Sequence, residues 1–385
     1  MAGETAAAAL GMCPKDAGCA DPELDEAAVA VLDRPGALSV SIVVVSYNYA
    51  VYLAEAVESA LAQTYPCTEV VVVDDGSTDA SREILRAFGD RIRLVLKDNG
   101  GETSAVNAGF AASLGDIVMF LDSDDILDPA AAGAVVEAWR PGTEKVQFRL
   151  IMIDAEGQTQ GWGFPRYPPG FSANDVDAMA RTLGFYPTPP TTGNAYGRSF
   201  LGQILPLDTH LFPFAPDGAL NVVAPLYGEV VTLDRTLGCY RVHDRNMWAS
   251  PTLNPERILS WIALGRKEAA FLRAHAQTLG VRIGADDPLD HSWIYLQRRL
   301  AARKLTPDHP LVAGERPLTL FMLACRALRR EEPDIVRRTV KIAWFLATAV
   351  SPERIARRFL EWVFVPSAKQ SLLRRLRRMK ISARR

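Results

Sequence analysis

Cysteine is scarce in this 385-residue sequence, which holds five cysteines and no CxxC spacing. Five is an odd number, and none of the cysteines lies beside a cluster of histidines. We therefore expect neither a disulfide framework nor a zinc site, and a reducing compartment such as the cytoplasm fits this composition.

Long hydrophobic runs are also missing. The longest apolar stretch near the C-terminal end, residues 342–350, is far shorter than the roughly 20 residues that span a bilayer. The first residues lack a basic start followed by an apolar run, so we do not expect a signal peptide. We expect a protein that is cytoplasmic, either soluble or peripheral on the inner face of the plasma membrane.

A large net charge is lacking too, since the formal value is −2, but the charge is unevenly spread. Residues 334–385 hold 14 Lys and Arg against 3 Asp and Glu, so the rest of the chain is acidic. A basic end on an acidic body indicates an anionic partner. No nucleic-acid recognition motif accompanies the charge, and we expect no nucleic-acid partner.

The basic end combines arginines with apolar residues. Residues 342–350 and 359–365 are aromatic and aliphatic with flanking arginines, and LLRRLRRMKISARR closes the chain. This is the composition of a helix that lies in a membrane interface and binds anionic headgroups. The alternative is a helical subdomain packed on the core with a solvated basic end.

The chain divides into three parts by pattern. Residues 1–38 are an Ala-, Asp- and Glu-rich leader without a clear period, residues 39–250 form the main domain, and residues 251–385 form a helical region with the basic tail. Within the main domain, buried strands are predicted at 40–45, 69–73, 92–96 and 117–121, with helices between them. Asp128 and Pro129 predict the cap and first residue of a further helix. Residues 161–193 are rich in Gly, Pro and aromatics and predict loops, whereas residues 255–350 predict helices.

Alternation of this kind predicts an α/β fold, with a mostly parallel sheet flanked by helices. Ligands bind at the carboxyl ends of such strands. Ser46, Tyr47 and Asn48 follow the first strand, where a dinucleotide-binding protein would carry GxGxxG, so a nucleotide is held in another way. The segment 74–79 follows the second strand. A carboxylate there can accept a hydrogen bond from a base N–H while Tyr47 offers a ring for stacking, although a turn with a capped helix explains the same residues.

The fourth strand is followed by Asp122, Ser123, Asp124 and Asp125. Residues two apart on a strand point to the same side, so Asp122 and Asp124 can share one hard cation if the strand continues that far. Carboxylates suit Mg²⁺ or Mn²⁺, which also take phosphate oxygens as ligands. The alternative is an acidic loop before a helix.

Three segments in order, VSIVVVSYN, VVVDDGSTD and NGGETSAVNAGFAASLGDIVMFLDSDD, lie within residues 39–130, about a quarter of the chain. Together they resemble the family 2 glycosyltransferases. The resemblance implies a GT-A fold and an enzyme dependent on a Mg or Mn divalent cation. It would move a sugar, with inversion, from a nucleotide-diphosphate donor to a glycan or lipid-linked acceptor in cell-envelope or exopolysaccharide synthesis.

The resemblance also implies roles for single residues. Ser46 and Tyr47 contact the donor, and Asp75 binds its uracil. Asp122 lies near the ribose and the metal, and Asp124 binds the metal and diphosphate. Asn99, Gly100 and Asn107 border the donor.

The catalytic base of the family usually belongs to an acidic pair. The best counterpart, Ala215 to Gly218, holds one carboxylate, Asp217, which we predict as the base. Asp208 is a rival, and Asp217 also reads as a turn or helix-cap aspartate. Residues 237–248 resemble a further segment of the family, in which His243 approaches the metal or diphosphate and Arg241 or Arg245 offsets phosphate charge. A structural role for His243 is the alternative. Residues 191–194 are predicted to line the pocket.

Two other functions remain open. A catalytically inactive protein that holds a nucleotide sugar would explain the missing acidic partner of Asp217. A nucleotidyltransferase would need a glycine-rich basic loop after the first strand, where this chain has SYNYAVYL.

Overall fold

The computed structural model describes residues 36–243, 245–246, 252–284, 287–332 and 334–365. These residues belong to two compact units, Met1–Arg241 with Ala270–Gly284, and Val242–Ala269 with Ala285–Arg385. Almost all of the predicted leader and the terminal basic segment lie outside the described residues. The predicted division into residues 39–250 and 251–385 stays a proposal.

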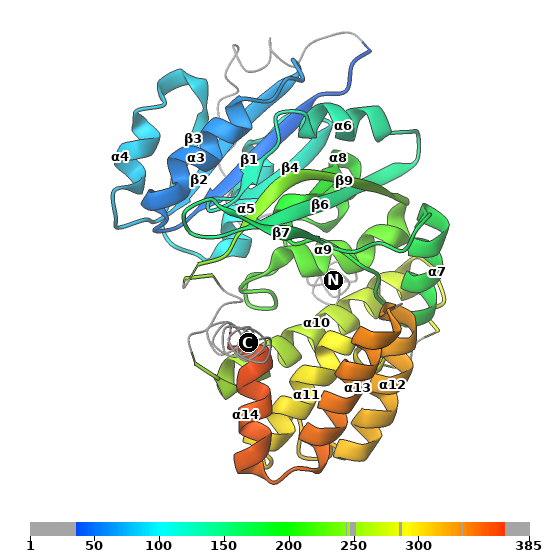
Figure 1. The fold of residues 1–385 in the computed structure, drawn as a ribbon. Coiled ribbons are helices and arrows are strands. Elements are labelled where there is room, and N and C mark those ends of the chain that lie inside the picture. Colours follow the sequence, from blue (N-terminus) through cyan, green and yellow to red (C-terminus); the bar gives the residue numbers. More distant parts are fainter. Residues whose placement is uncertain (1–35, 244, 247–251, 285–286, 333, 366–385) are drawn as a thin grey trace, which may run out of the picture. The chain divides into compact units, whose positions relative to one another are not determined.

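The first unit is built on a sheet whose first four strands are parallel (Figure 1). They are β1 (Val40–Ser46), β2 (Thr68–Asp75), β3 (Arg93–Lys97) and β4 (Ile117–Asp122), in the order β3-β2-β1-β4. All four were predicted. The apolar runs of β1, β2 and β4 are almost completely buried, as expected when helices cover both faces, whereas β3 at the end of this order is only partly buried.

The alternation of side chains along β1 explains why both faces need helices. Val44 and its neighbours on one face pack in the same core as α3 (Ala50–Leu61). Val43 points the other way, toward α5 (Glu102–Ala112). A Cβ added at Gly109 of α5 would lie 2.3 Å from Val43 Cγ1, so glycine is required for this close approach.

The rest of the sheet is mixed. Its strands are β5 (Ile126–Leu127), β6 (Thr143–Ile153), β7 (Thr159–Phe164), β8 (Asn194–Gly197) and β9 (Glu229–Arg241). β8 is antiparallel to both β4 and β6, β7 is antiparallel to β6, β5 is antiparallel to β9, and β9 is parallel to β6. The α/β class is confirmed, but beyond its first four strands the sheet is mixed, with β6 and β9 as its one further parallel pair among the described strands. Short connections such as that between β6 and β7 favour antiparallel pairing.

The other helices of the first unit correct two predictions. They are α4 (Ser81–Arg86), α6 (Ala131–Ala138), α7 (Ala173–Leu183), α8 (Arg198–Ile204) and α9 (Pro216–Tyr227), with 3₁₀ turns at Gly89–Arg91 and Thr191–Gly193. α6 begins at Ala131 rather than at Pro129, because Asp128 Oδ1 accepts the Ala130 N–H in a turn before the helix. Residues 161–193 are not only loops, since they include part of β7 and all of α7, which Ser172 and Asp175 close with a capping box.

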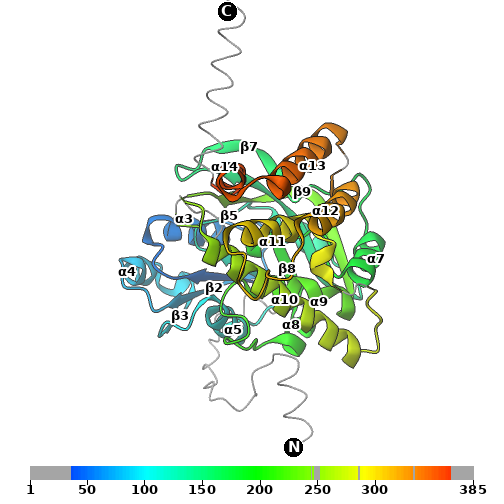
Figure 2. The ribbon, with the colours of Figure 1, turned by 90° about the horizontal axis from the view of Figure 1, so that it is seen from below.

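The second unit is helical, as predicted (Figure 2). It contains the first part of α10 (Pro255–Thr278), a 3₁₀ turn (Pro288–Asp290), α11 (Trp293–Leu305), α12 (Pro317–Glu331), α13 (Ile335–Val350) and α14 (Glu353–Phe364). Leu296, Leu300, Leu320, Phe345 and Leu360 form its core. Among the described residues, no helix combines the length and apolar character needed to cross a membrane.

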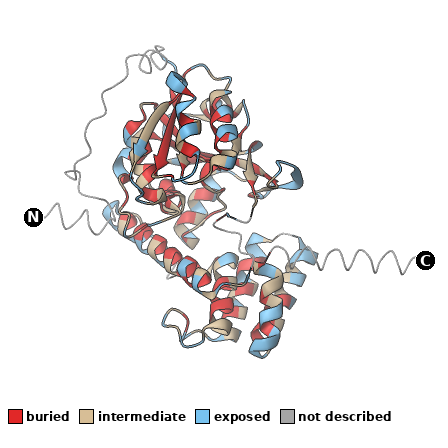
Figure 3. Cartoon of the chain, turned by 90° about the vertical axis from the view of Figure 1, so that its left-hand side faces the viewer, coloured by how far each residue is buried: buried red, intermediate tan, exposed pale blue. Residues whose placement is uncertain are grey.

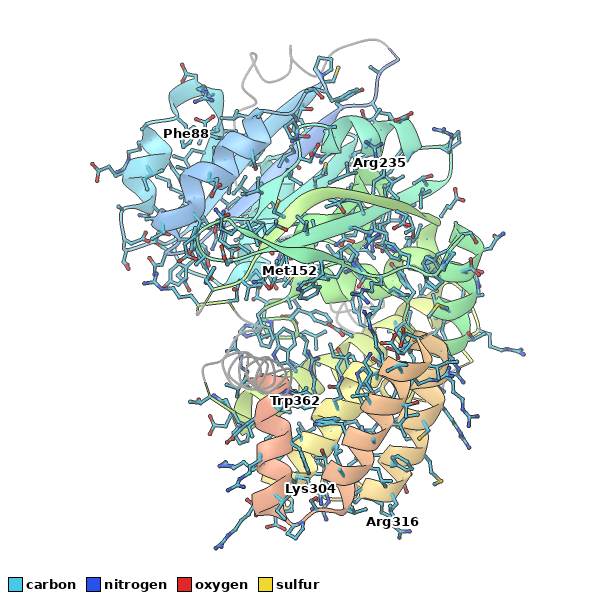
Figure 4. The ribbon with its side chains drawn as sticks, viewed as in Figure 1. Phe88, Met152, Arg235, Lys304, Arg316 and Trp362 are labelled. Atoms are coloured by element: carbon cyan, nitrogen blue, oxygen red, sulfur yellow. The ribbon has the colours of Figure 1, made fainter. Side chains whose placement is uncertain are left out.

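Each unit has its own buried core (Figure 3). Phe88 belongs to the core of the sheet, and Trp362 of α14 packs against the core of the helical unit (Figure 4). The polar side chains considered next lie on the first unit, at and beyond the ends of its parallel strands.

Candidate functional site

The ends of the parallel strands bring the predicted donor residues to one edge of the sheet. β1 lies between β2 and β4, with Ser46 opposite Asp74 and Val45 opposite Asp122. Ser46 is buried and its Oγ has no hydrogen-bond partner in the protein. Tyr47 is 46% exposed, so its ring is accessible for stacking on a planar ligand.

Asn48 joins the loop after β1 to the loop after β2. Its backbone has φ +57°, a left-handed conformation that asparagine tolerates. Its Oδ1 accepts hydrogen bonds from the N–H groups of Thr78 (2.8 Å) and Asp79 (3.3 Å), and its own N–H donates to Ser77 Oγ (2.9 Å). The sequence pattern placed Asn48 in the motif but did not predict this bridging role.

Asp75 organises a third loop. Its buried carboxylate accepts hydrogen bonds from Lys97 Nζ (2.5 Å) and Gly100 N (3.0 Å) on Oδ1 and from Gly101 N (2.8 Å) on Oδ2. Asn99 Nδ2 donates to the Asp75 carbonyl (3.0 Å). A carboxylate has about four acceptor positions, and three of them are used within the protein here. Binding of a nucleobase by Asp75 stays a prediction.

Asn107 and Asp208 have local roles in the structure. Asn107 Nδ2 donates to the Leu207 carbonyl and Asn107 Oδ1 accepts the Leu207 N–H, both at 2.9 Å. Asp208 Oδ1 accepts the N–H groups of His210 (2.7 Å) and Leu211 (3.3 Å). Asn107 therefore holds α5 against the segment that leads to α9, and Asp208 closes a turn within it. Donor contact by Asn107 stays a prediction.

The acidic residues after β4 form a turn. β4 ends at Asp122, and the Asp125 N–H donates to the Asp122 carbonyl (3.0 Å). The strand does not continue to Asp124, so the condition for strand alternation between Asp122 and Asp124 is not met, although the charges of Asp124 and Asp125 still act on Asp122. Asp125 is held by the Thr192 hydroxyl (2.6 Å) and the Arg241 N–H (2.9 Å). Thr192 thus contacts the acidic turn directly, and lining of the donor pocket by residues 191–194 stays a prediction.

Several other carboxylates lie close enough to Asp122 for their charges to affect it. Burial raises the pKa of Asp122 well above its ordinary value, and the negative charges of Asp125, Glu102, Asp124 and Asp217 raise it further. We call these five residues the acid cluster. They come from three places along the chain, the start of α5, the end of β4 and the start of α9. Like charges so near one another disfavour ionisation unless a cation balances them.

Asp217 and Glu102 titrate near neutrality within this cluster. Burial raises the pKa of Asp217 to about 6, while the Gly218 N–H and the charge of Lys145 act in the opposite direction. Burial raises the pKa of Glu102 to about 7 against the hydrogen bond from the Ala215 N–H, and the charges of Asp217 and Asp124 add to the rise. The sequence analysis did not identify Glu102 as a site residue, because an acidic residue in the first turn of a helix is usually explained by its favourable interaction with the helix dipole.

Lys145 is a buried cation beside the cluster. Its Nζ donates to Gln147 Oε1 (3.1 Å) and the Tyr186 hydroxyl (3.2 Å), and burial holds the pKa of Lys145 well below its ordinary value. The Tyr186 hydroxyl donates to the Asn221 carbonyl of α9 (2.8 Å). Lys145 therefore belongs to a polar network that anchors the helix carrying Asp217. Its place in the middle of a strand gave no sequence signal.

Arg241 stabilises the acidic turn from within the protein. It is 2% exposed, and its Nε donates to the Asp124 carbonyl (2.8 Å). Its Nη2 donates to Glu55 Oε2 (2.5 Å), and its guanidinium lies 4.6 Å from the Tyr52 ring centroid. These contacts occupy Arg241 in the fold, so the structure gives no support for the predicted phosphate role.

His243 and Arg245 belong to the second unit. The His243 N–H donates to Asn246 Oδ1 (2.5 Å), and His243 Nδ1 accepts the Arg245 N–H (3.1 Å). These contacts describe a local turn. Metal binding by His243 and phosphate binding by Arg245 stay predictions.

A divalent cation fits the chemistry of the acid cluster. In the part of the chain that the structure describes, no three His, Cys, Asp or Glu side chains converge as a ready metal site. Asp122 and Asp124 nevertheless offer hard oxygen ligands inside a cluster of excess negative charge. Mg²⁺ commonly binds one or two carboxylates and completes its shell with waters and substrate phosphates.

The family model that matches this chain describes glycosyltransferases, and three similar proteins carry that name. The model of glycosyl transferase family 2 matches residues 41–186. An uncharacterized glycosyltransferase of Nostoc sp. is 34% identical over 214 residues, which cover 54% of this chain and 66% of that protein. Glycosyltransferase GlyG of Streptococcus pneumoniae is 45% identical over 92 residues, 23% of this chain and 31% of that protein. An uncharacterized glycosyltransferase of Rickettsia prowazekii is 44% identical over 90 residues, 23% of this chain and 28% of that protein. The chain thus spans less than two thirds of these relatives.

Solved structures resemble the chain more loosely. S. aureus TarS 1–349 in complex with UDP-GlcNAc has a TM-score of 0.44 at 16% identity and covers 85% of this chain and 91% of its own. Mannosyltransferase PcManGT from Pyrobaculum calidifontis, in complex with GDP-Man and Mn²⁺, has a TM-score of 0.43 at 18% identity and covers 87% and 90%. Similarity at this level assigns no residue roles.

Proposed function

Because the chain belongs to glycosyl transferase family 2, we propose that it is an inverting, metal-dependent transferase with a nucleotide-diphosphate sugar as its donor. The observation that carries this proposal is the acid cluster, in which the end of β4 and the starts of α5 and α9 contribute carboxylates to one place. A sugar acceptor can be deprotonated and a diphosphate can leave at such a place.

Asp217 is the proposed base. Its carboxylate removes the proton of an acceptor hydroxyl as that oxygen attacks the anomeric carbon, and the bond to the nucleoside diphosphate breaks on the opposite face. A base is most effective when its pKa lies near the working pH, and the pKa of Asp217 is about 6. The product has inverted configuration, and the proton stays on Asp217 until solvent takes it.

Asp122 and Asp124 are the proposed ligands of Mg²⁺ or Mn²⁺. Such an ion, when bound, supplies Lewis-acid stabilisation of the departing diphosphate. Ser46, Tyr47 and Asp75 are proposed to receive the nucleoside, with Tyr47 stacking through its exposed ring. Asn99 and Gly100 border it through the loop that Asp75 holds.

The acceptor is proposed to be a glycan or a lipid-linked sugar of the cell envelope or an exopolysaccharide. Arg354, Arg357 and Arg358 on α14 are exposed, and Ile355 is 49% exposed beside them. Basic and apolar residues on one helix suit an anionic lipid surface. We therefore propose a cytoplasmic protein that binds peripherally to the inner face of the plasma membrane.

A test of the proposed function is release of nucleoside diphosphate from UDP-, GDP- and dTDP-sugars, with Mn²⁺ or with EDTA. We expect slow donor hydrolysis that needs the metal. The second candidate, an inactive nucleotide-sugar-binding protein, rests on the single carboxylate in residues 215–218. This candidate predicts that nucleotide sugars raise the unfolding temperature but that no nucleoside diphosphate is released. That result would refute the proposed transferase activity.

A further inference from the structure

The turn before α9 has an unusual backbone. Ala215 has φ +51° and ψ +55°, the left-handed region that residues with a Cβ rarely adopt. It also precedes Pro216, and a residue before proline normally has an extended conformation. Such outliers persist only where surrounding contacts impose them. Asp217 follows two residues later, as the second residue of the helix.

The contact that holds Ala215 comes from α5. The Ala215 N–H donates to Glu102 Oε2 (3.0 Å). Glu102 is the first residue of α5, and the preceding Gly101 is itself bonded to Asp75. A Cβ at Gly101 would lie 3.1 Å from the Pro213 carbonyl oxygen, so α5 also packs closely against the chain just before Ala215.

A second contact between the same two segments limits their movement. Asn107 binds both backbone groups of Leu207, eight residues before Ala215. The segment 207–215 is therefore tied to α5 at both ends. The hydrogen bond from the Ala215 N–H to Glu102 fixes the backbone conformation at the residue that precedes α9.

We propose that Glu102 is a positioning residue for Asp217, holding the left-handed turn at Ala215 so that the Asp217 carboxylate stays in the acid cluster. This inference rests on the proposed function, in which Asp217 is the base. Rotation about the Ala215 backbone bonds would move the first turn of α9 and with it the carboxylate. Misplacement by about 1 Å can lower a rate by about 100-fold.

A competing explanation is that Glu102 acts through its charge, as the second carboxylate that residues 215–218 lack. Two explanations of its importance can be separated by substitution. Glu102→Gln keeps an oxygen that accepts the Ala215 N–H and removes the charge. Glu102→Ala removes both the acceptor and the charge.

The test measures kcat and the donor KM for both variants with the best nucleotide sugar and Mn²⁺. We expect Glu102→Ala to lower kcat by about 100-fold with little change in the donor KM, and Glu102→Gln to stay within about tenfold of the unmodified protein. Glu83→Ala is the matched control, because Glu83 is an exposed acid in the first turn of α4. Equal losses in Glu102→Gln and Glu102→Ala would overturn the proposal in favour of a charge effect.

Amide hydrogen exchange gives a readout that does not need activity. Glu102→Ala should speed exchange in peptides covering residues 210–218, whereas Glu102→Gln should leave it slow. Unchanged exchange in Glu102→Ala overturns this inference alone. Undiminished turnover in Asp217→Asn would instead overturn the proposed base, so the two failures are distinguishable.

Discussion

At the scale of single residues, the chemistry depends on carboxylates that are costly to ionise. Burial raises the pKa values of Asp122, Asp217 and Glu102, and the charges of neighbouring carboxylates raise those of Asp122 and Glu102 further. Burial disfavours their charged forms in the folded protein. In the proposed function, a bound cation stabilises the charge of Asp122, and the charged form of Asp217 acts as the base. Predictions at this scale concern charge and proton affinity.

Asp124→Ala should abolish metal-dependent donor hydrolysis and leave the fold intact, because the variant removes a proposed metal ligand. Turnover with Mn²⁺ and thermal unfolding measure the two effects. Asp128→Ala is the control, since Asp128 is exposed and lies outside the acid cluster. Full activity in Asp124→Ala would refute the metal role.

Asp217→Asn should lower kcat far more than it changes the donor KM. In the unmodified protein, the rate should rise with pH up to about 6 and then level off, because only ionised Asp217 accepts the acceptor proton. A pH–rate profile that is flat between pH 5 and 7 would count against Asp217. A change confined to the donor KM would assign it to donor binding.

The free energy of unfolding should fall with rising pH, whereas the rate should rise. The folded pKa values of Asp217 and Glu102, about 6 and about 7, lie above their ordinary values of 3.8 and 4.5, so the folded state binds more protons between pH 4 and 7. The free energy of unfolding should therefore fall as pH rises through that window. Asp217→Asn should raise it on the order of 1–3 kcal/mol at pH 8, measured by urea unfolding without metal. A destabilised variant would contradict this account.

At the scale of elements, close packing of α5 on the sheet fixes where Glu102 and Asn107 lie. Gly109→Ala should destabilise the protein by about 1–3 kcal/mol, because its Cβ would lie 2.3 Å from Val43 Cγ1 in a filled core. Gly133→Ala in α6 is the matched control, since its nearest neighbour would be 4.0 Å away and alanine favours a helix. Urea unfolding measures both. Equal effects of the two changes on the free energy of unfolding would contradict this prediction, because they would show that the core around α5 can accommodate the added methyl group.

The elements that the sequence predicted well are those with strong periodicity. The valine runs of β1 and β2 and the helical pattern after residue 255 needed no tertiary information. The start of α6 was misplaced because Asp128 bonds locally in a turn rather than at the helix terminus. The sequence left open whether the fourth strand reaches Asp124; it does not, because the Asp125 N–H donates to the Asp122 carbonyl and the chain turns there. Glu102 and Lys145 were missed because their roles arise from contacts distant in sequence, 113 residues away to Ala215 for Glu102 and 41 residues away to Tyr186 for Lys145.

At the scale of the whole molecule, charge is segregated along the chain. The acid cluster lies on the first unit, and residues 334–385 carry the excess of Lys and Arg. Deletion of residues 367–385 should lower binding to vesicles that contain anionic lipid, because it removes eight of the 14 Lys and Arg in residues 334–385 and no Asp or Glu. Co-sedimentation with anionic vesicles measures the change, and vesicles of neutral lipid are the control. Unchanged sedimentation would remove the support for a membrane partner.

The way Asp75 holds its loop has a consequence for anyone who wishes to change the preferred nucleotide. Its carboxylate fixes Gly100 and Gly101, Gly101 leads directly into Glu102, and Glu102 bonds to Ala215. In the proposed function, base selection by Asp75 and proton removal by Asp217 therefore depend on one series of contacts. Libraries built at Asp75 should yield mostly slow enzymes, whereas libraries at the exposed Tyr47 ring can alter selectivity while leaving that series of contacts untouched.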